Sequence, residues 1–545
     1  IWDVRDPAKP VLASHLVCFT EQGDPSIYGH LLFVSAESPG SRLDCGTQGI
    51  QDSVSADRMV GIRIFDISDI AHPKQVADVQ TCRGSHTHTL VEDPSDKGVV
   101  YVYVSGLAPV RPSAELAGCE TGGPNTALFR IEVIRVPLAH PEQAKIVSSP
   151  RIFTDLTRAA THGAAIEDTA NGAAITQARS FLPLIGLPAK TTAADSNRAA
   201  QLIAEAMYER DTSKFTGISD SLHALGINIP LVPDSGASQG PSQCHDITLY
   251  PSAGYGAGAC SGYGILLNIK DPVHPVRLNA AADSNFSFFH SATFTNDASK
   301  VLFTDEWGGG VAAKCRATDP IDWGADAVFD IEHNTLVHKG YFKMPAAQTP
   351  AENCVAHNGN LVPVPGRDIM VQGWYQGGLS VFDFTDADHV KEIAYFDRGP
   401  IDPSKIVIGG YWGGYYYNGY IYGSEIARGL DVFKLTPTAD LTQNEIDAAK
   451  LVHFDILNPQ DQPKIVWPAA FPVALAYVDQ LKRDNGLPAD RLTAIENALE
   501  SARSASGAKR TAALKKLSAD LAKDAPRATD SKRVTLLEGV VKNLK

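Results

Sequence analysis

The sequence has 545 residues, too many for one compact core unless that core is built from repeats. Its hydrophobic content of 44% is that of an ordinary globular protein, and no run approaches the roughly 18 apolar residues of a membrane helix. The formal net charge of -14 argues against nucleic acid or an anionic membrane as the main partner, because both favour basic surfaces.

A pattern of short strands recurs along the first 436 residues. Its clearest copy, Cys354 to Asp386, contains a strand at Asn360–Val364, a turn at Pro365–Asp368, a strand at Ile369–Gln372, a crossing rich in aromatic residues and glycine at Trp374–Gly378, and a closing strand at Leu379–Phe384. Alternating apolar residues are typical of a strand with one packed face. The Pro that often follows ends the strand, since it cannot extend a ladder.

Seven closing strands of this form can be identified. They begin at Ile1, Gly61, Ile131, Gly264, Ala325, Gly378 and Gly429. Seven repeats predict an all-β, seven-bladed β-propeller over residues 1–436. The first copy lacks inner strands, so either residues before Ile1 supply them or the ring stays open. The seventh blade is therefore incomplete in this sequence.

The eight cysteines follow the repeat, and none forms a CxxC pair. Four precede a first strand and four follow a second strand, which are positions at the same edge of an antiparallel hairpin. We predict the pairs Cys18–Cys45, Cys82–Cys119, Cys244–Cys260 and Cys315–Cys354. Disulfides indicate an exported protein, with a signal sequence expected upstream of Ile1, whereas eight buried free thiols would indicate a cytosolic one.

The third repeat contains a predicted helical insert at about residues 165–240. We expect a helix over Ser196–Tyr208 that is capped by Ser196, and then a flexible stretch at Asp234–Gln243. Inserts of this kind either carry binding specificity or are tolerated surface additions, and both interpretations remain open.

After Leu435 the apolar period changes from two to about 3.6. Residues 437–468 predict a helix, with Thr442 and Glu445 at capping-box spacing, and a Pro-rich linker. Residues 469–545 predict a small helical bundle. The insert and the bundle are candidate surfaces for a protein partner.

Histidines recur immediately before the innermost strands. They are His86, His88, His245, His290 and His357, with His162 as a further candidate. Because innermost strands line the channel of a propeller, we expect several imidazoles to converge near one mouth.

The second strands end in a matching polar signal at Asp305–Glu306, Gln372 and Ser424–Glu425, with a looser parallel at Glu37. We predict a metal site with the ligands His88, His245, His290, His357, Glu306 and Glu425. We predict supporting roles for His86, Asp246, Asp305 and Gln372. Imidazoles with carboxylates suit a transition metal or Zn²⁺, and Ca²⁺ is a further candidate. Alternatively, the ring binds only water.

Two of the closing strands, GIRIFDISD at 61–69 and GLSVFDFTD at 378–386, resemble those of bacterial LVIVD-repeat proteins. Cys244-His245-Asp246, Phe289–Ala292, Glu352–Gly359 and Gly423–Glu425, with His86 and His88, are similar to one secreted branch of that family. The resemblance covers about residues 1–436. It implies a propeller in an exported or cell-surface protein and brings no known reaction.

Two hypotheses follow from the sequence. The first is a secreted or cell-surface propeller that binds a metal ion or small ligand at its channel mouth. A redox-active or Lewis-acid metal there would give an oxidase or hydrolase of unnamed substrate. The second is a non-enzymatic extracellular scaffold for protein–protein contacts.

Overall fold

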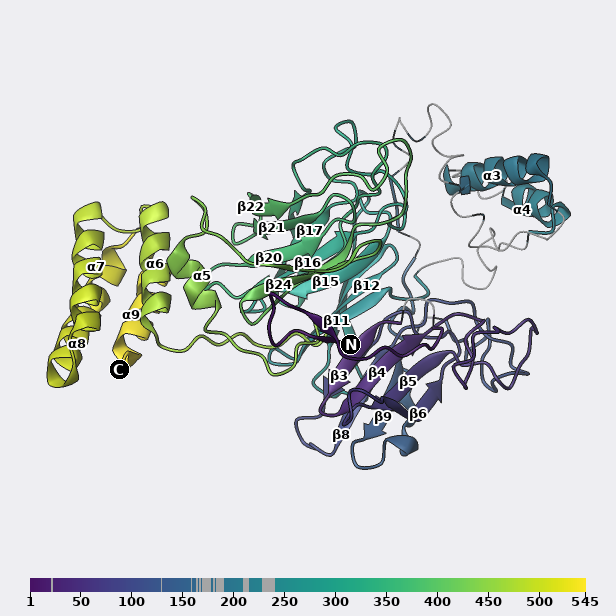
Figure 1. Ribbon diagram of the computed structural model, residues 1–545, viewed down its shortest axis with the longest axis horizontal. Helices are drawn as coiled ribbons and strands as arrows, with labels where there is room; N and C mark the ends of the chain where they lie inside the picture. Colours follow the sequence, from purple (N-terminus) through teal and green to yellow (C-terminus); the bar gives the residue numbers. More distant parts are fainter. Residues whose placement is uncertain are drawn as a thin grey trace.

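The computed structural model describes residues 1–20, 23–128, 130–157, 159–162, 165, 168, 178–179, 182, 191–208, 215–227 and 241–545. Within these ranges the protein is mostly β, with antiparallel sheets at its centre and a helical region at the C-terminal end (Figure 1). None of the described helices combines the length and apolar character needed to cross a bilayer.

Four sheets have four strands each, in sequence order, and a fifth sheet has seven. The first contains β3 (Pro25–Tyr28), β4 (Leu31–Ala36), β5 (Gly61–Asp66) and β6 (Lys74–Gln80). The second contains β7 (Thr89–Glu92), β8 (Val99–Val104), β9 (Glu132–Pro137) and β10 (Lys145–Ser148), with the short 3-10 helix η1 (Pro141–Gln143) before β10. The third contains β11 (Asp246–Tyr250), β12 (Tyr255–Cys260), β13 (Tyr263–Asn268) and β14 (Val276–Ala282).

The fourth sheet contains β15 (Phe289–Phe294), β16 (Lys300–Asp305), β17 (Asp326–Glu332) and β18 (Thr335–Phe342). The fifth contains β19 (Asn358–Val362), β20 (Ile369–Gly373), β21 (Leu379–Asp383) and β22 (Lys391–Phe396). A sixth group of three strands, β23 (Tyr411–Tyr417), β24 (Tyr420–Glu425) and β25 (Gly429–Phe433), joins the fifth sheet through a parallel pairing of β19 with β23.

The sheets pack face to face, with their first strands next to one another. The Thr248 hydroxyl of β11 donates to the Ala292 carbonyl of β15, 2.8 Å away, and the Asn360 amide of β19 donates to the Tyr416 carbonyl of β23 at 3.0 Å. Hydrophobic clusters form between adjacent sheets, and all six residues of β8 are buried. Strands that are covered on both faces have nearly continuous runs of apolar residues in their sequences. This arrangement is propeller-like.

The predicted closing strands are the third strands of their sheets, and a fourth strand follows each of the five from β5 to β21. The fourth strands, such as β6 and β14, are mostly half-exposed, and a register shift interrupts the ladder between third and fourth strands. A bulge of this kind breaks the alternation of period two. The repeat pattern in the sequence therefore identified the third strand of each sheet as its last and missed the fourth.

The first copy of the repeat forms only a hairpin, in which β1 (Trp2–Asp3) pairs with β2 (Val11–Leu12). These two strands correspond to the third and fourth strands of the other sheets. The described residues thus contain six groups of propeller strands and this partial one.

All eight cysteines lie in disulfides, and the pairs are the four expected from the sequence. They are Cys18–Cys45, Cys82–Cys119, Cys244–Cys260 and Cys315–Cys354. Each bond joins a residue before a first strand to one at or after the end of a second strand.

The insert contains α3 (Ala193–Tyr208) and α4 (Phe215–Ala224), which pack on each other through residues such as Leu202 and Leu222. The predicted cap at Ser196 was wrong. The hydroxyl of Thr192 accepts the N–H of Asp195 at 3.1 Å, so the helix begins one turn earlier and Ser196 lies inside it. Most of the remaining insert, including 234–240 of the predicted flexible stretch, lies outside the described residues.

The C-terminal helices are α5 (Gln443–Ala449), α6 (Phe471–Arg483), α7 (Ala489–Ser504), α8 (Gly507–Asp524) and α9 (Ser531–Asn543), with the 3-10 turn η3 (Ala525–Arg527). The predicted capping box of Thr442 and Glu445 is present at α5. Leucines and valines of α6 to α9 form one core. Buried Glu445 connects this region to the sheets, because it binds Arg367 at 2.9 Å and Arg483 at 2.6 Å.

The segment 454–467 crosses the ends of the first strands. Its hydrogen bonds reach five of the six strand groups: Asn458 to Ile27, Gln460 to Leu249, Gln462 to Phe294, Trp467 to Pro363 and Phe454 to Asn418. These contacts lie at the ends of the strands farthest from the histidines. The segment therefore covers the ends of the first strands that lie away from the histidines.

Candidate metal centre

The histidines gather where the first strands begin. His86 precedes β7, His245 precedes β11, His290 is the second residue of β15 and His357 precedes β19. Each first strand lies beside the next, so the four side chains form a row. The ring centroids are 4.3 Å apart from His86 to His245, 3.9 Å from His245 to His290 and 4.2 Å from His290 to His357.

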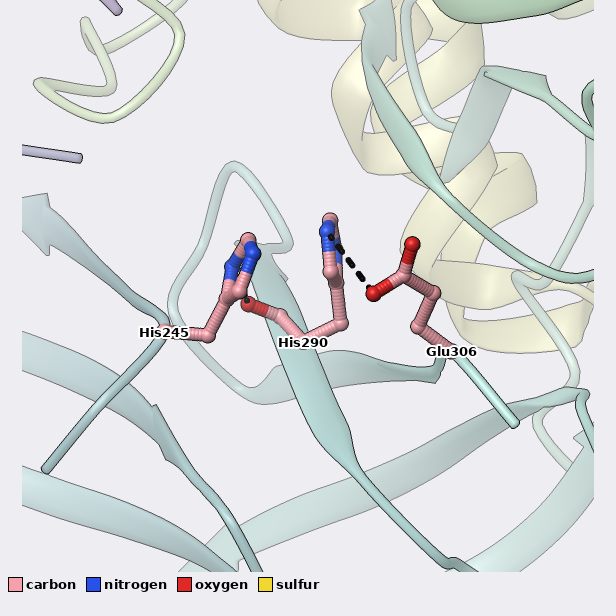
Figure 2. A group of neighbouring side chains, drawn as sticks. All are labelled: His245, His290 and Glu306. Atoms are coloured by element: carbon pink, nitrogen blue, oxygen red, sulfur yellow. Dashed lines mark hydrogen bonds and ion pairs between the residues drawn. The ribbon is translucent and has the colours of Figure 1, made fainter. Parts of the chain in front are cut away.

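His245, His290 and Glu306 form the tightest group. One ligand atom from each lies within 4.8 Å of the others, and all three residues are buried. Figure 2 shows the two imidazoles side by side, with the Glu306 carboxylate beyond His290. Nε2 of His290 is 3.8 Å from Oε2 of Glu306. Ligand atoms of a tetrahedral site are roughly 3.4 Å apart, given bonds of roughly 2.0–2.1 Å, so an ion would draw these groups closer together.

Main-chain carbonyls fix the tautomers of two of the histidines. Nδ1 of His245 is 3.1 Å from the carbonyl oxygen of His290, and Nδ1 of His357 bonds the carbonyl oxygen of Trp412. A carbonyl can only accept, so Nδ1 carries the proton in both rings. The Nε2 lone pairs of His245 and His357 therefore remain for an ion, the usual arrangement of a histidine ligand.

The electrostatics suit a cation. Burial lowers the pKa values of His245 and His290 well below 6.5 and that of His357 to about 3, so all three are neutral near pH 7. Burial also raises the pKa of Glu306 to about 7. A bound cation would favour the ionised form of the Glu306 carboxylate. The neutral imidazole is the form of histidine that binds metals.

Glu306 is also held by a tyrosine that the sequence analysis did not single out. The Tyr375 hydroxyl donates to Oε1 of Glu306 at 2.6 Å, and the Tyr375 ring is 4.7 Å from that of His357. Nε2 of His357 lies 3.7 Å from the same Oε1 atom. The only sequence signal was that Tyr375 lies within the glycine-rich crossing of the fifth repeat.

His86 and Glu37 form a pair at one end of the row. Nδ1 of His86 is 2.5 Å from Oε1 of Glu37. Burial opposes protonation of His86, but the hydrogen bond and charge of Glu37 outweigh it and raise the pKa of His86. The raised pKa favours the protonated imidazole, which does not bind metals, so a supporting role, as the sequence predicted, fits His86.

Three predicted ligands lie outside the group of His245, His290 and Glu306. His357 adjoins it, with Nε2 3.7 Å from Oε1 of Glu306, whereas His88 and Glu425 bond other residues. Nδ1 of His88 bonds the hydroxyl of Ser35 at 2.8 Å, and burial lowers the His88 pKa to about 3. The carboxylate of Glu425 accepts the main-chain N–H groups of Gly410 and Arg428. Both residues are buried, but these hydrogen bonds give them local structural roles.

The predicted supporting residues are dispersed around the mouth. Asp305 accepts the N–H groups of Phe288 and Gly324, both at 2.9 Å, and so holds the turn before β15. The Gln372 amide faces away from the row and donates to Asp326 at 2.8 Å.

Asp246, next to His245, is buried, and its pKa is raised to about 6 by that burial. His162 stacks on Trp323 with ring centroids 3.9 Å apart and is not part of the row.

No family model matches the sequence, and no curated protein matches it. Among solved structures, a protein from Lactobacillus plantarum is similar at 12% identity over 77% of this chain and 86% of its own, with a TM-score of 0.37. Hydrazine synthase from Kuenenia stuttgartiensis is similar at 8% identity over 75% and 81%, with a TM-score of 0.36. A luciferin-regenerating enzyme is similar at 10% identity over 75% and 84%, with a TM-score of 0.31. With such scores, the description of the fold rests on the sheets themselves.

Proposed function

We propose that the protein binds a transition metal or zinc ion through His245, His290 and Glu306, with His357 as a fourth ligand. The observation that carries this proposal is the convergence of three buried ligand atoms within 4.8 Å. The fixed Nδ1–H of His245 and the neutral state of the imidazoles support it.

The donor set narrows the choice of ion. Two or three imidazole nitrogens with one carboxylate suit Zn²⁺ or a first-row transition metal, whereas Ca²⁺ prefers an all-oxygen shell. Two histidines and one carboxylate also form the ligand set of zinc hydrolases and of non-haem iron oxygenases. The proposed activity is therefore a metal-dependent hydrolase or oxidase whose substrate enters at the mouth.

The number of blades, the family and the cellular location of the protein are also proposals. We infer a seven-bladed ring, in which β1 and β2 belong to a seventh blade, and the motifs quoted above support membership of the LVIVD-repeat family. Four disulfides favour an oxidising compartment outside the cytoplasm. A secreted or cell-surface protein is the location that fits this chemistry.

Metal analysis of purified native protein tests the proposed site. We expect a stoichiometric transition metal or zinc in the wild type, and its loss in His290→Ala. His88→Ala is the matched control, because it removes another buried mouth imidazole that bonds Ser35 instead. Retention of the metal in His88→Ala would support the site formed by His245, His290 and Glu306. Loss of the metal would support the sequence prediction, in which His88 is also a ligand.

The contrary result is equally clear. A protein that stays metal-free after incubation with Zn²⁺, Co²⁺, Cu²⁺ and Fe²⁺, while its four disulfides are intact, would refute the metal site. Such a result would leave the extracellular scaffold as the better hypothesis.

A further inference from the structure

Tyr375 packs its ring against His357 and donates its hydroxyl to only one oxygen of Glu306. Its hydroxyl donates to Oε1 at 2.6 Å, while Oε2 faces Nε2 of His290 at 3.8 Å. Tyr375 is 4% exposed, so water does not compete freely for this hydrogen bond. The two oxygens of the carboxylate therefore have different partners.

The backbone holds Tyr375 in this place at a conformational cost. Its φ of 52° lies in the left-handed region, which is strained for a non-glycine residue and recurs at functional sites. The N–H and carbonyl of Tyr375 both bond Tyr411, at 3.2 and 2.9 Å. The fold thus fixes this residue from both sides of its peptide unit.

Two glycines make room for Tyr375. A Cβ on Gly310 would come within 2.2 Å of the Tyr375 hydroxyl, and one on Gly410 within 1.9 Å of its main-chain carbon. Both glycines have positive φ values, 67° and 88°, which side chains rarely adopt. Turns on two other strand connections are therefore shaped around this tyrosine.

These contacts determine how Glu306 can bind an ion. A carboxylate with both oxygens free can bind with one or with two, and two oxygens would fill an additional coordination position. The Tyr375 hydroxyl uses one lone pair of Oε1, whereas Oε2, 3.8 Å from Nε2 of His290, accepts no hydrogen bond from Tyr375. Oε2 is therefore the freer oxygen for an ion shared with His245 and His290. His245, His290, Glu306 and His357 then supply four protein donors, which leave positions open on an ion that takes five or six ligands.

We infer that Tyr375 is a positioning residue that keeps Glu306 a one-oxygen ligand, so that the bound metal accepts a small exogenous oxygen or nitrogen donor. This inference rests on the proposed metal site. It assigns to that site an open coordination position, which a purely structural ion would lack.

Azide titration of the Co²⁺-loaded protein tests this inference, because the visible bands of Co²⁺ report its coordination number and added anions. We expect the wild type to bind one Co²⁺ and then azide. In Tyr375→Phe, both Glu306 oxygens become free to bind the ion. Its azide affinity should then fall at least about tenfold, the scale of outer-shell effects, with one Co²⁺ still bound and altered bands.

Tyr250→Phe is the control. Tyr250 is also buried, and its hydroxyl donates to the Asn296 carbonyl at 2.6 Å, remote from Glu306. It should keep the wild-type spectrum and azide affinity, although it also loses a buried hydrogen bond.

The outcomes are separable. Wild-type azide affinity and spectrum in Tyr375→Phe would overturn the role of Tyr375 and leave the metal site standing. Co²⁺-loaded wild type that binds no azide would overturn the open position, even if Tyr375→Phe failed to fold. Wild type that binds no Co²⁺ or other tested metal would overturn both the metal site and this inference.

Discussion

Glu425 accepts a hydrogen bond from the main-chain N–H of Gly410, 2.8 Å away, at the start of the sixth group of strands. Asp305 accepts the N–H of Phe288 at 2.9 Å in the fourth sheet, and the strand register gives Asp305 and Glu425 the same position. Glu425 is thus the counterpart of Asp305, one residue before the position of Glu306. Each carboxylate accepts a main-chain N–H group just before a first strand and so stabilises the turn there.

This equivalence predicts different effects for two glutamate substitutions. Glu306→Gln should weaken metal binding by at least roughly 100-fold, beyond the roughly 10–100-fold that outer-shell changes cause. Glu425→Gln should keep the metal and lower the free energy of unfolding by about 1–3 kcal/mol, because hydrogen bonds to a charged acceptor are lost. Calorimetric metal titration and thermal denaturation measure the two effects. Equal metal affinity in both variants would contradict the assignment.

The disulfides lead to a second prediction. Protein denatured without reductant should show no titratable thiol, and reduction should release all eight. Replacing Cys315 and Cys354 together by alanine should lower the free energy of unfolding by about 2–5 kcal/mol, since a bond closing a 39-residue separation is lost. Thiol titration and urea denaturation provide the measurements, and free thiols in the native protein would contradict the pairing.

A third prediction concerns Asp326, which is fully buried and accepts the Gln372 amide. Burial raises the pKa of Asp326 well above 3.8, so the folded protein keeps a proton that the unfolded chain releases above about pH 4. Wild-type stability therefore falls as pH rises between these two pKa values. Asp326→Asn removes this loss, so its advantage should grow from pH 5 to pH 8, by at most about 1.4 kcal/mol per pH unit.

Urea denaturation at several pH values measures this difference. Asp388→Asn, at an exposed position, is the control for the loss of one carboxylate. A stability difference between Asp326→Asn and wild type that stays constant over this pH range would show that Asp326 is ionised in the folded protein.

The hydrogen bonds of the segment 454–467 lead to a fourth prediction. Gln462 bonds both the N–H and the carbonyl of Phe294 in β15, at 2.9 and 2.7 Å. Gln462→Ala would leave these buried groups without their partner and should cost about 1–3 kcal/mol of stability. Gln443→Ala, on the exposed face of α5, should change the unfolding midpoint far less. Similar midpoints for both variants would mean that the segment 454–467 contributes little to the ring.

The sequence predicted much of the fold because its signals are local. Alternating third strands recur at short intervals, and cysteines at hairpin ends could be paired from strand direction alone. The fourth strands were not predicted, because a bulge and partial exposure disrupt the alternation of apolar and polar residues in them. The seventh blade stays a prediction, since residues 1–12 provide only a hairpin.

The candidate site was predictable in composition but not in exact membership. His245, His290 and Glu306 follow from the repeat, because neighbouring first strands lie side by side. A shift of one or two residues decides whether a side chain joins them, which is why His88 and Glu425 face other partners. Tyr375 approaches Glu306 from a different sheet through a left-handed backbone, and no periodicity encodes such a contact.

The segment 454–467 also has a consequence for biosynthesis. A ribosome makes it only after all six groups of propeller strands, since it follows β25 in the chain. Until that moment, the ends of the first strands remote from the histidines lack the hydrogen bonds that this segment provides. Synthesis of this segment therefore completes the hydrogen bonds that link five of the six strand groups at this end.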